Sequence, residues 1–198
     1  MLIVGPLNKP LVLASSSPRR AEILTSVGWP FRAIVAGIDE TRRSEETPVE
    51  YVQRLALEKA QVVASKIESG IVLGADTTVV VEGTLLGQPV DTDDARLMLK
   101  LLSGKWHDVL TGVAILSVAD SPKVDYERTR VRFAEMSEAE IDWYISTGEP
   151  KGKAGAYAVQ GCAALFIKEI QGDYFNVVGL PIALLYRMLQ KIGYLIHG

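Results

Sequence analysis

The chain has 198 residues, of which 48% are hydrophobic and 23% are charged, with a formal net charge of -3. This length and composition suit one globular domain with a full core. A duplex DNA or RNA binder usually carries a strongly basic face, so the charge argues against a polymeric nucleic acid partner. The net charge does not exclude a small anionic substrate, because a few cationic side chains gathered at one site suffice to bind it.

The single cysteine, Cys162, cannot form an internal disulfide, which favours a reducing compartment. With only His107 and His197 available as partners, Cys162 is better explained as a small buried hydrophobe than as a nucleophile. No apolar run is long enough to span a bilayer, and the N-terminal segment lacks the pattern of a signal peptide. We therefore expect a cytoplasmic protein without a membrane partner.

The first part of the chain predicts a strand, a tight turn, a helix and a second strand. The apolar run over 11–15 fits a buried strand. Ser17 then fits a helix N-cap with Pro18 at the first helical position, and Gly28 marks the expected end of that helix. Residues 31–36 predict the next strand.

A capping box at 47–50 predicts a long helix over 49–70. Residues 71–86 are rich in β-branched side chains and predict strand structure with a turn at 82–83. The later elements follow in chain order: a helix over 93–104 capped by Thr92, strands over 106–118 and 123–134, a helix from a capping box at 137–140 to Gly148, a strand over 164–170, and a helix over 180–193.

Strands and helices alternate at first, and long strands then dominate. This order predicts an α/β or α+β fold with a mixed sheet and flanking helices. No linker divides the chain, so residues 1–198 are expected to form a single domain. If that domain has two lobes, the cleft between them is the expected ligand site.

The segment ASSSPRR, residues 14–20, joins a predicted strand to a helix start. Backbone N–H groups and the positive end of a helix dipole meet there, which favours phosphate binding. Ser15 and Ser17 lie in the turn, and Arg19 and Arg20 add donors that suit phosphate oxygens. An ordinary capped helix with solvated arginines is the alternative.

Acidic residues supply the second group of candidates. Asp76 interrupts a strongly apolar strand, where a carboxylate is costly unless a partner or a catalytic role explains it. A turn aspartate at a strand end is the alternative. Glu40 or Asp39 could join Asp76 around a divalent cation, although two carboxylates do not specify a metal site and solvated loop acids are the more common explanation.

Other candidates are less distinctive on their own. Lys59 would ordinarily be a surface lysine on its helix, and His107 has no obvious partner, so we interpret it as structural. The glycines of 152–161 permit close backbone approach to a ligand, and Gln160 could hydrogen-bond a base edge. The sequence lacks the G-x-x-x-x-G-K-[ST] motif of P-loop NTPases.

Taken together, these segments resemble the Maf family. The matching segments run in order from residue 13 to residue 181: LASSSPRRAEIL, AGIDET, LALEKA, VLGADTTV, LSGKWHDVLTGVAI, KAGAYAVQG and GDYFNVVGLP. The resemblance implies a twisted mixed α/β sheet with two lobes around a cleft, similar to the inosine triphosphate pyrophosphatase fold. It also implies hydrolysis of nucleoside triphosphates to a monophosphate and diphosphate with a divalent metal, Mg or Mn.

The same resemblance implies roles for individual residues. Asp76 would be the proton acceptor, and Glu40 and Asp76 would hold the metal. Lys59 and Arg19 would contact phosphates. Ser15, Ser17 and Arg20 complete the expected substrate site of the turn. The pattern S-P-R-R, with Thr77 and Gln160, is similar to the branch acting on dTTP and UTP.

Two departures qualify the resemblance. Gln88 stands where the family commonly has lysine, and Gly152 stands where aspartate is usual. Glutamine cannot replace an ammonium as a stabiliser of charge, so a slower or differently selective enzyme is expected unless Arg96 or Lys105 compensates. A nucleotide-binding regulator linked to septum formation is the alternative function, and a phosphatase releasing single phosphates is a third. A homodimer is also open, because the family is often dimeric.

Overall fold

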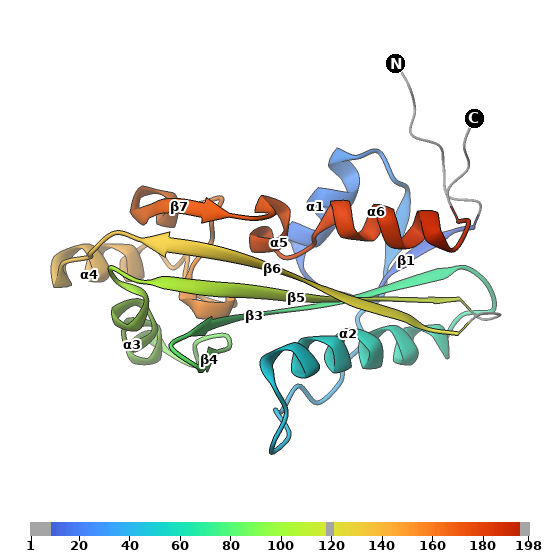
Figure 1. Ribbon diagram of the computed structural model, residues 1–198, viewed down its shortest axis with the longest axis horizontal. Helices are drawn as coiled ribbons and strands as arrows, with labels where there is room; N and C mark the ends of the chain where they lie inside the picture. The colour runs from blue at the N-terminus through green and yellow to red at the C-terminus, as the bar shows by residue number, and fades with distance from the viewer. Residues whose placement is uncertain (1–8, 118–120, 195–198) are drawn as a thin grey trace. The chain divides into compact units, whose positions relative to one another are not determined.

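The computed structural model describes residues 9–117 and 121–194, and these form a seven-stranded sheet in the order β2-β1-β3-β5-β6-β7, with β4 paired to β3 (Figure 1). The strands are β1 (Leu11–Leu13), β2 (Phe31–Ala33), β3 (Ile71–Val81), β4 (Thr84–Leu86), β5 (Trp106–Ser117), β6 (Lys123–Phe133) and β7 (Ile167–Gln171). Strand β1 pairs in parallel with both β2 and β3, whereas β3–β4 and β6–β7 are antiparallel. The predicted mixed sheet is confirmed.

Helices flank the sheet, as the sequence predicts. They are α1 (Pro18–Ser26), α2 (Pro48–Ala64), α3 (Thr92–Leu102), α4 (Glu138–Ser146), α5 (Tyr174–Val178) and α6 (Ile182–Lys191), with 3-10 turns η1 (Ala154–Ala156) and η2 (Cys162–Phe166). No helix in the described part of the chain has the length and apolar character needed to cross a membrane.

The capping boxes are confirmed at both predicted positions. Thr47 Oγ1 accepts from the backbone N–H of Glu50, and Ser137 Oγ accepts from the backbone N–H of Glu140. The N-cap of α3 is Asp91 rather than Thr92, because the Asp91 carboxylate accepts from the N–H three residues later.

Several predicted boundaries are wrong. Helix α2 ends at Ala64 rather than Gly70, β2 stops at Ala33, and the expected strand over 164–170 begins only at Ile167. The predicted turn at 82–83 is confirmed, since both residues have positive φ and join β3 to β4. Residue 118, the expected end of β5, and His197 lie outside the described residues.

The chain divides into two compact units. As far as the structure describes them, the first comprises Met1–Asp76, Thr111–Glu127 and Gly179–Gly198, and the second comprises Thr77–Leu110 and Arg128–Val178. Strands β3, β5 and β6 each contribute residues to both units.

In the first unit, α2 packs on one face of the sheet, whereas α1 and α6 lie on the other (Figure 1). The core between α2 and the sheet is built from small and β-branched side chains: Val12, Ala14, Ala36, Ala56, Ala60, Val63, Val72 and Ala114. Two glycines allow the helix to approach closely. A Cβ at Gly74 would lie 2.0 Å from the carbonyl oxygen of Ala56, and one at Gly112 would lie 2.2 Å from that of Val52.

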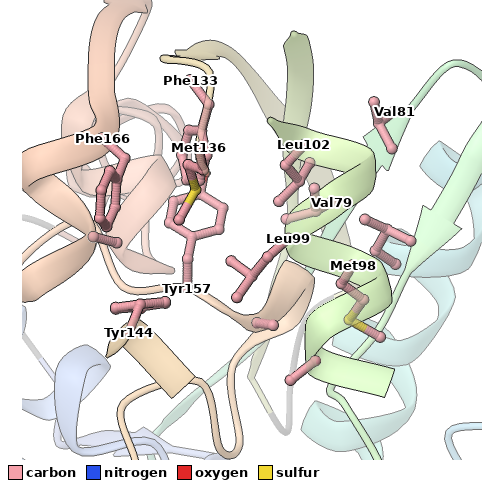
Figure 2. Packing of buried hydrophobic residues seen from close by; sticks show 14 of the residues in the cluster. Val79, Val81, Met98, Leu99, Leu102, Phe133, Met136, Tyr144, Tyr157 and Phe166 are labelled. Carbon is pink, nitrogen blue, oxygen red and sulfur yellow. The ribbon is translucent and has the colours of Figure 1, made fainter. Parts of the chain in front are cut away.

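The second unit has a core rich in aromatic side chains, which Figure 2 shows from close by. Leu99 and Leu102 of α3 face Phe133 and Tyr157, whose rings pack edge to face with their centroids 4.9 Å apart. Arginines 128, 130 and 132 of β6 are exposed while the residues between them are buried, so this part of the strand has one face in solvent.

Candidate active site

Asp76 lies in the middle of β3, where its neighbours Ile71 to Ala75 are all buried. The side chain itself is only 7% exposed. A buried carboxylate is unfavourable unless it is paired and hydrogen-bonded, and here Lys59 supplies the partner. Lys59 Nζ donates to Asp76 Oδ1 at 2.6 Å.

Lys59 is buried because of its place on α2. The residues of this helix that face the core recur at helical spacing, and Lys59 falls between Ala56 and Val63 on that side. Its exposure is 9%, so the ordinary expectation of a surface lysine is wrong. The same ammonium lies 2.7 Å from Glu40 Oε1 and therefore bridges two carboxylates.

Burial raises the pKa of the Asp76 carboxyl above its usual value, although the cations Lys59 and Arg20 oppose this shift and the charge of Glu40 adds to it. A carboxylate with a raised pKa is a better proton acceptor than an ordinary one. The same surroundings affect Tyr51, whose pKa is raised to about 12 by burial and by the charges of Asp76 and Glu40.

Glu40 and Asp76 bring two oxygen donors to one place, which is the basis for testing a metal site. Mg²⁺ is usually held by one or two protein carboxylates together with substrate phosphates and water. No group of three or more His, Cys, Asp or Glu side chains that could hold a metal occurs among residues 9–117 and 121–194. Glu40 and Asp76 would supply two carboxylates to such a cation, and substrate and water oxygens would have to supply the other ligands.

The turn before α1 is organised by Ser15. Its Oγ accepts from the backbone N–H of Ser17 at 3.1 Å and from Nη1 of Arg20 at 3.0 Å. Arg20 is buried, and its Nε donates to the carbonyl oxygen of Gly179 at 2.8 Å. Arg20 thus ties the turn to the segment before α6, while Arg19 is only half-buried.

Thr77 and Gln160 belong to the second unit. Thr77 follows Asp76 on β3 and is half-buried, and Gln160 is exposed on the loop after η1. The buried end of this loop is held by Glu149, which accepts from the backbone N–H groups of Cys162 and Ala163 and from the hydroxyl of Tyr144. The structure thus gathers Glu40, Lys59 and Asp76, and it gathers Ser15 with Arg20.

The two departures from the family pattern lie close together in the second unit. Both are exposed, and a Cβ at Gly152 would lie 4.0 Å from Oε1 of Gln88. The cations considered as substitutes already have acidic partners. Lys105 pairs with Glu82 at 2.7 Å, and Arg96 pairs with Asp142.

His107 and Cys162 have structural surroundings. His107 Nε2 lies 2.9 Å from the hydroxyl of Tyr157, and its ring meets Phe133 and Tyr157 edge-on. Cys162 is partly buried against the core of the second unit. These contacts agree with a structural role for His107, whereas Cys162 is partly rather than fully buried.

Three residues near Glu40 escaped sequence reasoning: Glu46, Tyr51 and Arg54. Their hydrogen bonds join α2 to the loop of residues 39–46, which carries Glu40. The sequence signal for two of them is that Tyr51 lies about two turns, and Arg54 about one turn, before Lys59 on the same predicted helix.

The mixed sheet with flanking helices has a counterpart among solved structures. The structure of the Staphylococcus aureus Ham1 protein aligns with a TM-score of 0.53, covering 93% of this chain and 100% of that one at 14% identity. This likeness shows the fold alone.

Sequence relatives define the family more narrowly. Residues 10–192 match the family model described as Maf-like protein. A dTTP/UTP pyrophosphatase of Pelotomaculum thermopropionicum is 52% identical over 187 residues, covering 94% of this chain and 98% of the relative. One from Symbiobacterium thermophilum is 52% identical over 184 residues, covering 93% and 94%. The chain belongs to the Maf family.

Proposed function

We propose that the protein is a nucleoside triphosphate pyrophosphatase that hydrolyses dTTP and UTP to the monophosphate and diphosphate. The observation that carries the proposal is the buried Asp76 carboxylate, hydrogen-bonded by Lys59 beside Glu40. Relatives that are about half identical over nearly the whole chain are named dTTP/UTP pyrophosphatases, which supports the pyrimidine substrates.

In the proposed reaction, Asp76 accepts a proton from water as the water oxygen bonds to the α-phosphorus. The bond from this phosphorus to the oxygen bridging to the β-phosphate breaks, and diphosphate leaves. Lys59 holds the Asp76 carboxylate in place by its 2.6 Å hydrogen bond. Arg19 and the N–H groups at the start of α1 would bind phosphate oxygens.

Glu40 and Asp76 are the residues that would hold a divalent cation, Mg or Mn. Such an ion would offset negative charge on the triphosphate and on the departing diphosphate. Thr77 and Gln160 are proposed to recognise the pyrimidine base. A single domain, a cytoplasmic location and a homodimer stay predictions from the sequence.

The alternative is a nucleotide-binding regulator that binds the nucleotide with little turnover. The observation that favours it is Gln88, a neutral side chain where the family commonly has lysine, together with the pairing of Lys105 and Arg96 to other residues. Tight binding of dTTP without release of diphosphate would support this alternative. Release of single phosphates would instead support a phosphatase.

The proposal is tested by Asp76→Asn. Asparagine keeps the shape of the side chain but cannot accept the proton, so we expect diphosphate release from dTTP and UTP with Mg²⁺ or Mn²⁺ to fall by at least about 100-fold. Asp108→Asn is the matched control, because Asp108 is also a strand aspartate paired with a cation, Arg128. A folded Asp76→Asn protein with near-normal turnover would contradict the assignment.

A further inference from the structure

We propose that Arg54 is a positioning residue, which holds the loop that carries Glu40 so that this carboxylate lies beside Lys59 and Asp76. The inference rests on the proposed function for its catalytic meaning, but its structural part can be tested separately. Its basis is a network of hydrogen bonds between residues 39–46 and α2.

Glu40 needs such support because little holds its side chain. It lies in a segment without helix or strand, between β2 and α2, and its side chain is 52% exposed. Its carboxylate contacts Lys59. A glutamate side chain has several rotatable bonds, so an unsupported loop would spread its carboxylate over many positions.

Arg54 makes the central contacts of the network. Its Nε and Nη2 donate to the two carboxylate oxygens of Glu46 at 2.6 and 2.9 Å, and the side chains are 13% and 8% exposed. Nη2 also donates to the carbonyl oxygen of Thr41 at 3.2 Å. A forked pair with both oxygens engaged fixes orientation as well as distance.

Neighbouring hydrogen bonds also fix the backbone at Glu40 itself. The Tyr51 hydroxyl donates to the backbone carbonyl oxygen of Glu40 at 3.0 Å. Asp39 Oδ1 accepts from both the N–H and the hydroxyl of Thr41, which stiffens the turn around Glu40. The backbone is therefore fixed on both sides of Glu40, whose carboxylate contacts Lys59.

The network ends on the same helix that carries Lys59. Tyr51, Arg54 and Lys59 all lie on α2, so the helix fixes their spacing. Arg54 and Tyr51 determine where the Glu40 backbone lies, and Lys59 receives the Glu40 carboxylate at 2.7 Å. The function of Arg54 is thus exerted through Glu40, in the way that outer residues orient metal-binding side chains.

The test uses Arg54→Met, which keeps the apolar stem of the side chain and removes the guanidinium. Hydrogen exchange, followed by mass spectrometry, should become faster in residues 38–47 but not elsewhere. Mn²⁺ binding without nucleotide, measured by electron paramagnetic resonance, should weaken about 10-fold. Diphosphate release from dTTP should then require correspondingly more Mn²⁺, with a smaller change at saturating metal.

Arg43→Met is the matched control. Arg43 lies in the same loop and pairs with Glu58 of α2 at 2.8 Å, but its side chain is 66% exposed. Exchange and Mn²⁺ binding should stay as in the wild type. Arg54→Lys should give an intermediate loss, because one ammonium cannot reproduce the forked contact. This variant also serves if Arg54→Met does not fold.

Double variants separate positioning from a general loss of structure. If Arg54 acts through Glu40, Arg54→Met should weaken Mn²⁺ binding in the wild type but not further in Glu40→Gln. An equal loss in both backgrounds, or unchanged exchange and Mn²⁺ affinity in Arg54→Met, would overturn the inference. A wild type that releases no diphosphate would contradict the proposed function, and the exchange result would still decide whether Arg54 holds the loop.

Discussion

At the scale of single residues, the side chains of the site differ in how readily the sequence identifies them as functional. Asp76 is conspicuous, since a carboxylate interrupts an apolar strand. Lys59 is not, because its burial depends on which side of α2 meets the sheet. Glu40 was one of two candidate loop acids, and only the family resemblance distinguished it from Asp39. Arg54 and Glu46 are charged residues in a charged region, and only three-dimensional contact reveals their pairing.

His107 gives a prediction about pH. It is 3% exposed, and burial lowers its pKa to about 4, from 6.5 in the unfolded chain, while the charge of Asp108 opposes the shift. Between these values the unfolded chain binds a proton that the folded protein does not. The stability due to neutral His107 is therefore complete above pH 6.5 and is lost as pH falls towards 4.

We expect His107 to contribute about 2 kcal/mol to the loss of unfolding free energy between pH 7.5 and pH 5. Urea unfolding at both pH values measures it. His107→Gln should remove this part of the pH dependence whatever its stability at pH 7.5. The carboxyls with lowered pKa, such as Glu46 and Glu140, titrate mainly below this window. An unchanged pH dependence in the variant would show that His107 is protonated in the folded protein.

At the scale of elements, most features that depend on neighbouring residues agree with the prediction, although the N-cap of α3 is Asp91 rather than Thr92, and features that depend on tertiary contacts do not. Capping boxes and the turn at 82–83 depend on residues within four positions of each other, and they are confirmed. Helix α2 ends before Gly70, whose Cβ would lie 2.9 Å from the carbonyl oxygen of Pro10. Gly70 therefore allows the chain to pass close to Pro10 at the start of β3, and it does not form the C-terminal end of α2.

The strand expected over 164–170 shows the same limit. Its first residues form the 3-10 turn η2, whose leading N–H groups are held by Glu149. This carboxylate comes from thirteen residues earlier in the chain, beyond the end of α4. Alternation of apolar side chains could not reveal such a partner, so the sequence predicted β7 too long.

The close approach of α2 to the sheet gives a prediction for Gly74. Alanine there would place a Cβ 2.0 Å from the Ala56 carbonyl oxygen, which is backbone and cannot move aside alone. We expect Gly74→Ala to lower the unfolding free energy by about 3 kcal/mol. Because α2 carries Lys59, diphosphate release should fall as well.

Gly87→Ala is the control for this prediction. No heavy atom lies within 4 Å of the Cβ built at Gly87, and its φ is not in the left-handed region. Its effect should stay within about 0.5 kcal/mol, as is usual for substitutions away from such contacts. Denaturant titration of the three proteins makes the comparison. Equal stability of Gly74→Ala and the wild type would mean that α2 can shift without cost.

At the scale of the whole molecule, the mixed α/β fold was predictable, because the order of strands and helices was sufficient to indicate it. Two lobes were expected from the family resemblance, but the positions at which the chain divides were not predictable, since no linker or change in composition marks them. Three of the four boundaries fall inside strands β3, β5 and β6, and the fourth directly follows α5. Unit boundaries are expected in loops and linkers, so the sequence does not predict boundaries within continuous strands.

These continuous strands predict that the two units unfold together. If one unit unfolded alone, three strands of the other would end abruptly and their backbone hydrogen bonds would be lost near the break.

The three tryptophans allow the unfolding of each unit to be followed separately, because Trp29 lies in the first unit and Trp106 and Trp143 lie in the second. In urea, fluorescence of Trp29 alone, in a protein carrying Trp106→Phe and Trp143→Phe, should report one transition. It should coincide with the transition by circular dichroism of the same protein. The reciprocal Trp29→Phe protein should show the same agreement for the second unit. Two separate midpoints within one protein would instead show independently folding domains and contradict the single domain expected from the sequence.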